Sequence, residues 1–190
     1  MLLKMQRLAT REYKIAVIGS SGVGKSSLCL QFARNKFPNS KKLLLTNYYR
    51  KQVSLDNEHI TIHILDTNGN EKTTNDFISQ AHGFIIVFDI TKSNTLIEVD
   101  NFYQLVRTIK NCFTVPLVLV GNKFDLNDIR LIGNENAQRV ALNLKCQYYE
   151  VSAKTKFNID LIFIECVRVN KRQFFRVRST ENTCCRCSVV

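Results

Sequence analysis

The chain has 190 residues, 45% of them hydrophobic, which is enough for one buried core and too few for two comfortable domains. Its formal net charge of +11 suits nucleic acid or an acidic membrane surface as a partner. No apolar run approaches the roughly 20 residues that cross a bilayer, and the charged start is too short for a signal peptide. We therefore expect a cytosolic protein whose seven cysteines are free thiols rather than a disulfide framework.

Strand-like and helix-like stretches alternate along most of the chain, which predicts an α/β fold with a largely parallel sheet and helices on both faces. An apolar, β-branched run at 13–18 predicts the first strand, and helical spacing of apolar residues over 27–34 predicts the first helix. The next two strands, at 48–55 and 59–65, are separated by a turn so short that they must pair antiparallel. The sheet is therefore predicted to be mixed, with one antiparallel edge strand.

The second half of the chain continues the alternation. Continuous apolar runs predict central strands that are covered on both faces. The predicted elements are a strand at 84–88, a helix that starts near 91–93 and ends near 109, a strand at 117–120, a helix at 135–144, a strand at 147–151 and a last helix at 158–172. After Arg178 the apolar periodicity stops, and we expect a disordered tail.

The loop between the first strand and the first helix matches the pattern G-x-x-x-x-G-K-[ST], from Gly19 to Ser26. Its glycines permit left-handed backbone angles, so that successive amide groups can converge on one phosphate chain. Lys25 can reach the β- and γ-phosphates, and the Ser26 hydroxyl can ligate Mg²⁺. The strand, loop and helix occur in the required order, which disfavours the alternative of an ordinary Gly/Ser-rich turn. The predicted nucleotide-binding residues of this segment are Ser21, Gly22, Val23, Gly24, Lys25, Ser26 and Ser27.

A second group of polar residues follows the strand at 59–65, at the edge where we expect partners of the phosphate loop. Asp66 can hold Mg²⁺ together with Ser26, and Gly69 offers an N–H group to a γ-phosphate. An ordinary turn aspartate is the alternative for Asp66. The phosphate loop earlier in the chain favours the metal site.

The residues Asn122, Lys123 and Asp125 close the strand at 117–120 and predict recognition of a purine base. One carboxylate facing guanine accepts two N–H groups, whereas adenine would leave that charge buried and unpaired. The stem of Lys123 can lie along the base, and the N–H group of Ala153 can donate to the guanine oxygen. The pattern therefore predicts GTP rather than ATP, with Ser152, Ala153 and Lys154 closing the site.

With these three motifs, the chain resembles the small GTPases of the Ras superfamily. Tyr-Arg-Lys-Gln-Val at 49–53 and Val-Leu-Val-Gly-Asn-Lys at 118–123 are very close to the Ras branch. The resemblance implies a P-loop three-layer sandwich over 1–172, whose sheet has five parallel strands and one antiparallel edge strand, with about five helices. Residues 173–190 would form a flexible tail.

The resemblance also implies cofactors, partners and one further binding residue. GTP or GDP would bind with Mg²⁺, and the partners would be exchange factors, GTPase-activating proteins and effectors, with no nucleic acid. The protein is expected to be a monomer. Phe37 would pack against the guanine, and its alternative is a core phenylalanine that ends the first helix.

Departures from the family concern the first switch segment. Its threonine, which ligates Mg²⁺ and meets the γ-phosphate, falls on Leu44, which has no hydroxyl. Thr46 lies two positions away and could substitute only if the loop follows a different path. The usual acidic effector-binding pair falls on Thr46 and Asn47, while Lys41 and Lys42 add positive charge. Effectors are therefore not expected to present basic surfaces.

In the second switch segment, the glutamine that orients the attacking water is replaced by Asn70, which is one methylene shorter. The segment is also about three residues shorter than in Ras, so its helix should be truncated. The predicted catalytic residues are Asn70, Gly69 and Lys25. We expect guanine nucleotide binding with slow intrinsic hydrolysis, or alternatively a nucleotide-binding scaffold without turnover.

The last four residues, from Cys187 to Val190, fit the prenylation signal C-a-a-X. Cys184 and Cys185 could be palmitoylated as a second membrane signal. From Arg168 onward the chain has six basic residues against one acidic residue, which favours a membrane over nucleic acid. The sequence therefore predicts anchoring at the cytoplasmic face of a membrane, with the plasma membrane as the expected one. Two alternatives are a disordered end that is merely rich in cysteine and a zinc site formed by these cysteines. The zinc site lacks a fourth ligand nearby.

Overall fold

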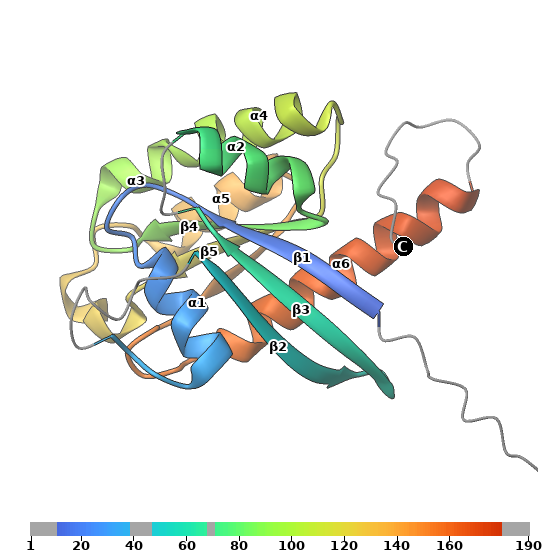
Figure 1. Ribbon diagram of the computed structural model, residues 1–190. Helices are drawn as coiled ribbons and strands as arrows, with labels where there is room; N and C mark the ends of the chain where they lie inside the picture. The colour runs from blue at the N-terminus through green and yellow to red at the C-terminus, as the bar shows by residue number, and fades with distance from the viewer. Residues whose placement is uncertain (1–10, 39–46, 68–70, 180–190) are drawn as a thin grey trace, which may run out of the picture.

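A computed structural model of the protein describes residues 11–38, 47–67 and 71–179, with side chains up to 173. Six strands of the described residues form one twisted sheet in the order β2-β3-β1-β4-β5-β6 (Figure 1). All neighbours pair parallel except β2 and β3, so β2 is the antiparallel edge strand, as predicted. The strands are β1 (Arg11–Ile18), β2 (Tyr48–Leu55), β3 (Glu58–Asp66), β4 (Gly83–Asp89), β5 (Leu117–Asn122) and β6 (Gln147–Glu150).

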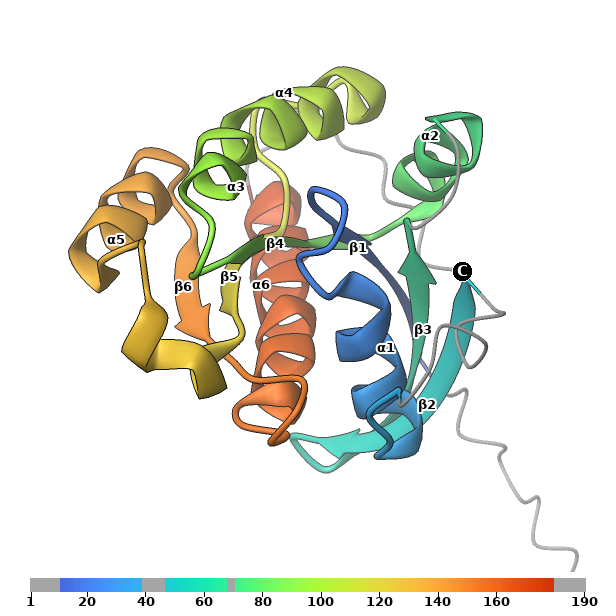
Figure 2. The ribbon, with the colours of Figure 1, turned by 90° about the vertical axis from the view of Figure 1, so that its left-hand side faces the viewer.

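Helices cover both faces of this sheet (Figure 2). They are α1 (Lys25–Arg34), α2 (Glu71–Gln80), α3 (Ser93–Ile97), α4 (Val99–Lys110), α5 (Asn134–Asn143) and α6 (Ile159–Ser179), with a short 3-10 helix η2 (Phe124–Ile129). Residues of α1 and α6 share one buried apolar cluster with one face of the sheet. Residues of α2, α4 and α5 share a second cluster with the opposite face. The predicted three-layer α/β sandwich is therefore confirmed.

The antiparallel hairpin is made by a two-residue turn. Leu55 pairs with Glu58, and between them Asp56 and Asn57 adopt left-handed angles with φ of 52° and 63°. Asp and Asn tolerate this conformation better than other residues that carry a side chain, and two such residues in succession match the twist of the strands. The turn places β2 beside β3 and at the edge of the sheet.

Two predicted helices differ from the structure. The helix expected from near 91–93 to 109 is divided at Glu98 into α3 and α4, which gives six α-helices in the described residues where about five were expected. The last helix was expected to end at 172, but α6 continues to Ser179, so the first part of the predicted flexible tail is helical. No glycine or proline interrupts the chain between 159 and 179, so nothing in the backbone ends the helix earlier.

The structure also bears on the cysteines and on membrane spans. Cys29, Cys146 and Cys166 are free thiols, as expected. Burial raises the pKa of Cys166 to about 12 and that of Cys146 to about 11, so both thiols are protonated and behave as apolar side chains. Within the described ranges, no helix has the length and apolar character needed to cross a bilayer.

Candidate functional site

The sequence motifs meet at one edge of the sheet, where the parallel strands end. The loop at 19–24 follows β1, Asp66 ends β3, Asn122 ends β5, and Ser152 follows β6. The strands β3, β1, β4, β5 and β6 run parallel and lie side by side in this order. Segments that lie far apart in the sequence therefore come together at the carboxyl ends of these strands. This edge is the place where open α/β sheets bind ligands.

The phosphate loop has a backbone that only glycine fits at two positions. Gly24 has φ 99°, and a Cβ atom there would lie 2.4 Å from the Nδ2 atom of Asn122. A Cβ atom at Gly19 would lie 2.2 Å from the carbonyl oxygen of Val87. The glycines therefore let the loop pass close to β4 and β5, which fixes its path.

Lys25 lies across this loop. Its Nζ atom donates hydrogen bonds to the carbonyl oxygens of Gly19 at 2.7 Å and Ser20 at 2.9 Å. Burial of the side chain lowers the pKa of Lys25, although the nearby Asp66 carboxylate acts in the opposite direction. An ammonium group that is desolvated in this way gains from a further negative charge, and a phosphate would supply it.

The amino terminus of α1 adds a second anion-binding feature. The helix starts at Lys25, directly after Gly24. No side chain caps it, and its first turn contains no acidic residue. Its first N–H groups therefore have no capping side chain, and the helix dipole favours negative charge at this end. Together with the ammonium group of Lys25, this arrangement suits a chain of phosphates.

Asp66 has the character of a cation ligand. It is 1% exposed, and its Oδ1 atom has no hydrogen-bond partner among the described residues. Burial raises the pKa of this carboxyl group, while a hydrogen bond with Ser26 and the charge of Lys25 lower it. A buried carboxylate oxygen that lacks a partner, next to a serine hydroxyl, fits the oxygen ligands that Mg²⁺ prefers. No group of three or more His, Cys, Asp or Glu side chains forms a metal cage in the described ranges, so phosphate oxygens would have to complete such a site.

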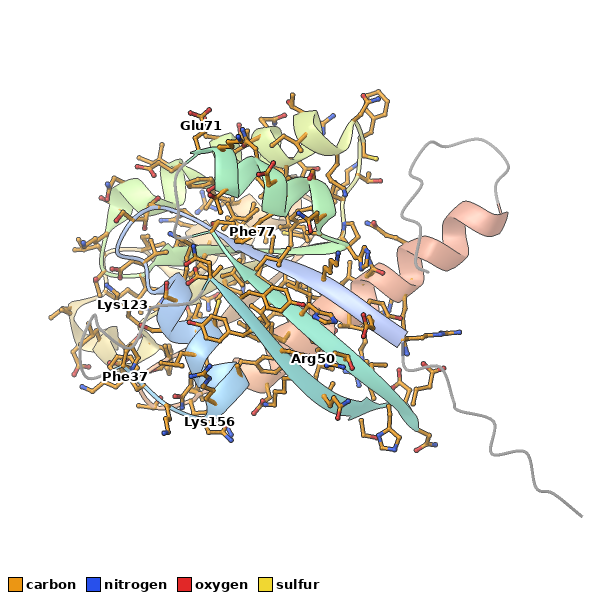
Figure 3. All side chains as sticks on the ribbon, viewed as in Figure 1. Phe37, Arg50, Glu71, Phe77, Lys123 and Lys156 are labelled. Atoms are coloured by element: carbon orange, nitrogen blue, oxygen red, sulfur yellow. The ribbon has the colours of Figure 1, made fainter. Side chains whose placement is uncertain are left out.

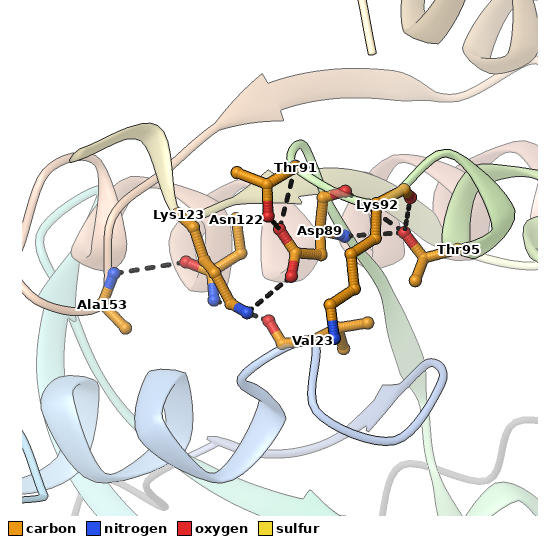
Figure 4. Close-up of polar contacts among 8 residues, drawn as sticks. All are labelled: Val23, Asp89, Thr91, Lys92, Thr95, Asn122, Lys123 and Ala153. Carbon is orange, nitrogen blue, oxygen red and sulfur yellow. Dashed lines mark hydrogen bonds and ion pairs between the residues drawn. The ribbon is translucent and has the colours of Figure 1, made fainter. Parts of the chain in front are cut away.

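Asn122 ties the phosphate loop to the opposite side of the site (Figure 4). Its side chain is 2% exposed, and its Nδ2 atom donates to the carbonyl oxygen of Val23 at 2.8 Å. Its Oδ1 atom accepts the N–H group of Ala153 at 3.3 Å. One amide group thus connects the segments after β1, β5 and β6. The hydrogen bond to Ala153 is long, so the N–H group of Ala153 could also donate to the oxygen of a purine.

The structure also brings Asp125 next to Ser152. The Ser152 hydroxyl donates to the Oδ1 atom of Asp125 at 2.6 Å and accepts the N–H group of Thr155 at 3.1 Å. Ser152 is fully buried, whereas Asp125 is exposed at the start of η2. The carboxylate is therefore fixed by a buried hydroxyl while it faces outward, as recognition of a base requires.

The comparison with known families agrees with this geometry. Residues 14–172 match the model of the Ras family. The chain belongs to the Ras family. It is therefore a small GTPase, a hydrolase that binds guanine nucleotides.

Phe37 of this Ras-family protein is 42% exposed, so the alternative of a core phenylalanine is wrong. Figure 3 draws Phe37 at the same end of the molecule as Lys123. Ser21 and Lys154 are exposed, and Ser27 is half-buried in the first turn of α1. These positions are compatible with the predicted contacts to a nucleotide.

Several predicted residues of the Ras-family site lie outside the described residues. In the first switch segment these are Lys41, Lys42, Leu44 and Thr46; in the second they are Gly69 and Asn70; in the tail they are Cys184, Cys185 and Cys187. The predictions made for them stay predictions. Of the second switch segment, the structure describes α2, a helix of ten residues that follows directly.

Sequence reasoning missed two features beside the base-recognition motif. Asp89 ends β4, is fully buried and contacts Lys123. The rings of Phe124 and Phe157 stack with centroids 5.1 Å apart and pack η2 against the segment after β6. Asp89 stands directly after an apolar strand, as Asp66 does, so the same signal could have identified it. The ring stack joins residues distant in sequence and has no local signature.

Proposed function

We propose that this Ras-family GTPase is a guanine nucleotide switch that binds GTP or GDP with Mg²⁺ at the edge formed by β1, β3, β5 and β6. The observation that carries the proposal is the position of Asn122, whose amide group connects the phosphate loop with the segment that contains Ala153. A ligand that fills both halves of this site must contain phosphates at one end and a base at the other. A nucleotide has this shape.

At the phosphate end, the backbone N–H groups of residues 21–27 would bind the α- and β-phosphates. Lys25 would exchange its contacts with Gly19 and Ser20 in part for contacts with the β- and γ-phosphates. Ser26 and Asp66 would hold Mg²⁺, which neutralises phosphate charge when it is bound. The buried Oδ1 atom of Asp66, which has no hydrogen-bond partner among the residues that the structure describes, supports this assignment.

At the base end, Asp125 would accept two N–H groups of guanine, with its carboxylate oriented by Ser152. The stem of Lys123 would lie along one face of the base, and Phe37 would pack against it. Adenine presents no matching pair of donors, so ATP would leave the carboxylate without these two hydrogen bonds. Ala153 and Lys154 would close the site around the guanine oxygen.

We propose that intrinsic hydrolysis is slow. The sequence has Leu44 in place of a threonine that meets the γ-phosphate, and Asn70 in place of a glutamine that orients water. Gly69 would still offer its N–H group to the γ-phosphate. These differences leave the groups that hold GDP unchanged and alter those that sense and cleave the third phosphate, so fast turnover would require a GTPase-activating protein.

The carboxyl end would anchor the protein to the cytoplasmic face of a membrane. Prenylation of Cys187 would supply one lipid and palmitoylation of Cys184 and Cys185 a second, since one lipid alone gives only marginal binding. Arg172, Arg176 and the other basic residues at this end would add attraction to anionic lipids.

A second candidate function is a membrane-bound scaffold that holds GDP or GTP without turning it over. Leu44 and Asn70 favour it, because both remove groups that the switch reaction uses. In either case, the partners would not be expected to present basic surfaces, because Lys41 and Lys42 give the first switch segment positive charge.

One experiment separates these functions. The purified full chain is denatured, its bound nucleotide is identified by chromatography, and GTP loaded into fresh protein is followed with time in the presence of Mg²⁺. Slow conversion of GTP into GDP supports the switch, and GTP that stays unchanged supports the scaffold. A chain that contains no guanine nucleotide and takes up none would contradict both, and hydrolysis as fast as in an ordinary Ras protein would contradict the roles given to Leu44 and Asn70.

A further inference from the structure

At the end of β4, a buried carboxylate contacts the loop that carries the base-recognition motif. Asp89 is fully buried, and its Oδ2 atom lies 2.5 Å from the Nζ atom of Lys123 (Figure 4). Lys123 follows β5 in a left-handed conformation with φ 71°, and its side chain reaches across to β4. A carboxylate in the interior is stable only with such a partner, because an unpaired buried charge is costly.

The other oxygen of this carboxylate is fixed as well. The Oδ1 atom of Asp89 accepts the N–H group of Thr91 at 2.9 Å and the hydroxyl of Thr91 at 2.7 Å. Burial raises the pKa of Asp89, but the hydrogen bonds from Lys123 and Thr91 outweigh it and hold the pKa below its ordinary value. The group is therefore ionised at neutral pH, with both oxygens held in one orientation.

The backbone around Asp89 is equally constrained. Asp89 pairs with Asn122 in the register of β4 and β5, and the N–H group of Ile90 donates to the carbonyl oxygen of Asn122 at 3.2 Å. After the strand, the hydroxyl of Thr95 accepts the N–H group of Asp89 at 3.0 Å and donates to the carbonyl oxygen of Lys92 at 2.7 Å. The carboxylate is thus a fixed point beside the residue that joins the two halves of the site.

We propose that Asp89 is a positioning residue of the nucleotide site, which fixes the side chain of Lys123 and thereby slows nucleotide release. This inference rests on the proposed function, in which the stem of Lys123 lies along the base. When Asp89 holds the ammonium group at the end of the Lys123 side chain, the aliphatic stem of Lys123 has few conformations. Less conformational entropy of this side chain is then lost when the nucleotide binds. Asp89 itself touches no part of the nucleotide.

The test uses the full chain loaded with a fluorescent GDP analogue, whose release is followed after addition of excess GDP. Asp89→Asn keeps the shape of the side chain and removes its charge, and the loss of one charged hydrogen bond is expected to accelerate release about tenfold. Thr91→Val removes only the hydroxyl bond and should give a smaller change in the same direction. Asp100→Asn, which changes an exposed carboxylate on α4, is the matched control and should leave the rate unchanged.

A second background shows whether Asp89 acts through Lys123. In the variant Lys123→Met there is no ammonium group to hold, so adding Asp89→Asn should no longer accelerate release. Release at the wild-type rate after Asp89→Asn alone, or an equal acceleration in both backgrounds, overturns the inference. If Asp89→Asn does not fold, Thr91→Val in the same two backgrounds decides it. A wild-type chain that takes up no fluorescent GDP overturns the proposed function, whereas normal loading with unchanged release overturns this inference alone.

Discussion

At the scale of single residues, the site combines side chains that connect segments with side chains that face outward. Asn122 satisfies the carbonyl oxygen of Val23 and the N–H group of Ala153, both in buried residues. Asp125 is exposed and is oriented by Ser152. The buried amide therefore contributes to folding stability as well as to the site, whereas the exposed carboxylate has little effect on folding.

Replacing Asn122 with alanine should destabilise the fold itself. The change leaves a buried acceptor and a buried donor without partners, so the free energy of unfolding should fall by about 3 kcal/mol. Chemical denaturation of the nucleotide-free proteins measures the loss, because bound ligand adds to the apparent stability and Asn122 lies in the nucleotide site. The matched control Asn101→Ala, at an exposed position of α4, should change the stability by less than about 0.5 kcal/mol. Equal stability of the two variants would show that the amide bonds contribute nothing.

At the scale of elements, sequence patterns predict those features that are fixed locally. The hairpin at Asp56 and Asn57 follows from a turn too short for any crossover, and the phosphate loop follows from its glycine spacing. The break at Glu98 and the continuation of α6 to Ser179 were not predicted, because apolar periodicity does not show where a helix is interrupted or ends without a glycine or proline. Contacts across the sheet, such as that between Asp89 and Lys123, depend on which strands become neighbours, and no local pattern contains this information.

One such contact joins β1 to the start of β4. The N–H group of Lys14 donates to the Nδ1 atom of His82 at 3.1 Å, and the N–H group of His82 donates to the carbonyl oxygen of Lys14 at 2.7 Å. Burial lowers the pKa of His82, and the charges of Lys110, Lys14 and His63 lower it further. The folded state therefore favours the neutral imidazole, whose Nδ1 atom can accept the hydrogen bond.

The stability of the protein should depend on pH through this histidine. Because the folded pKa lies below the unfolded value of about 6.5, the unfolded chain binds the proton more readily. The contribution of His82 is complete above about pH 6.5 and is lost as the pH falls through the lowered folded pKa. Between pH 7 and pH 5, the free energy of unfolding should fall less in His82→Gln than in the wild type. The control Asn101→Ala, which removes an exposed side chain of α4 that does not titrate, should keep the wild-type slope. Identical slopes in all three proteins would exclude this linkage.

At the scale of the whole molecule, the sheet separates two apolar clusters that meet different helices. The candidate site lies at the carboxyl ends of the strands, and these strands contribute residues to both clusters. A bound nucleotide would therefore contact the segments after β1, β3, β5 and β6 at once. A ligand that binds only the folded state stabilises it by mass action, regardless of which cluster unfolds first. Removal of the nucleotide should therefore affect the unfolding of the whole chain.

Stripping the protein of nucleotide with a chelator of divalent cations and a phosphatase should lower the midpoint of thermal unfolding. At a ligand concentration about a thousand times Kd, binding is worth about 4 kcal/mol, which corresponds to a shift of about 10 °C for a chain of this size. If Ser26 and Asp66 hold Mg²⁺ as proposed, GDP with Mg²⁺ should restore the midpoint in full and GDP without Mg²⁺ only in part. ATP should restore nothing, since adenine presents no pair of N–H donors to the Asp125 carboxylate. In Asp125→Ala, GDP should lose most of its effect, and equal rescue by ATP and GDP would contradict the assignment of the base site.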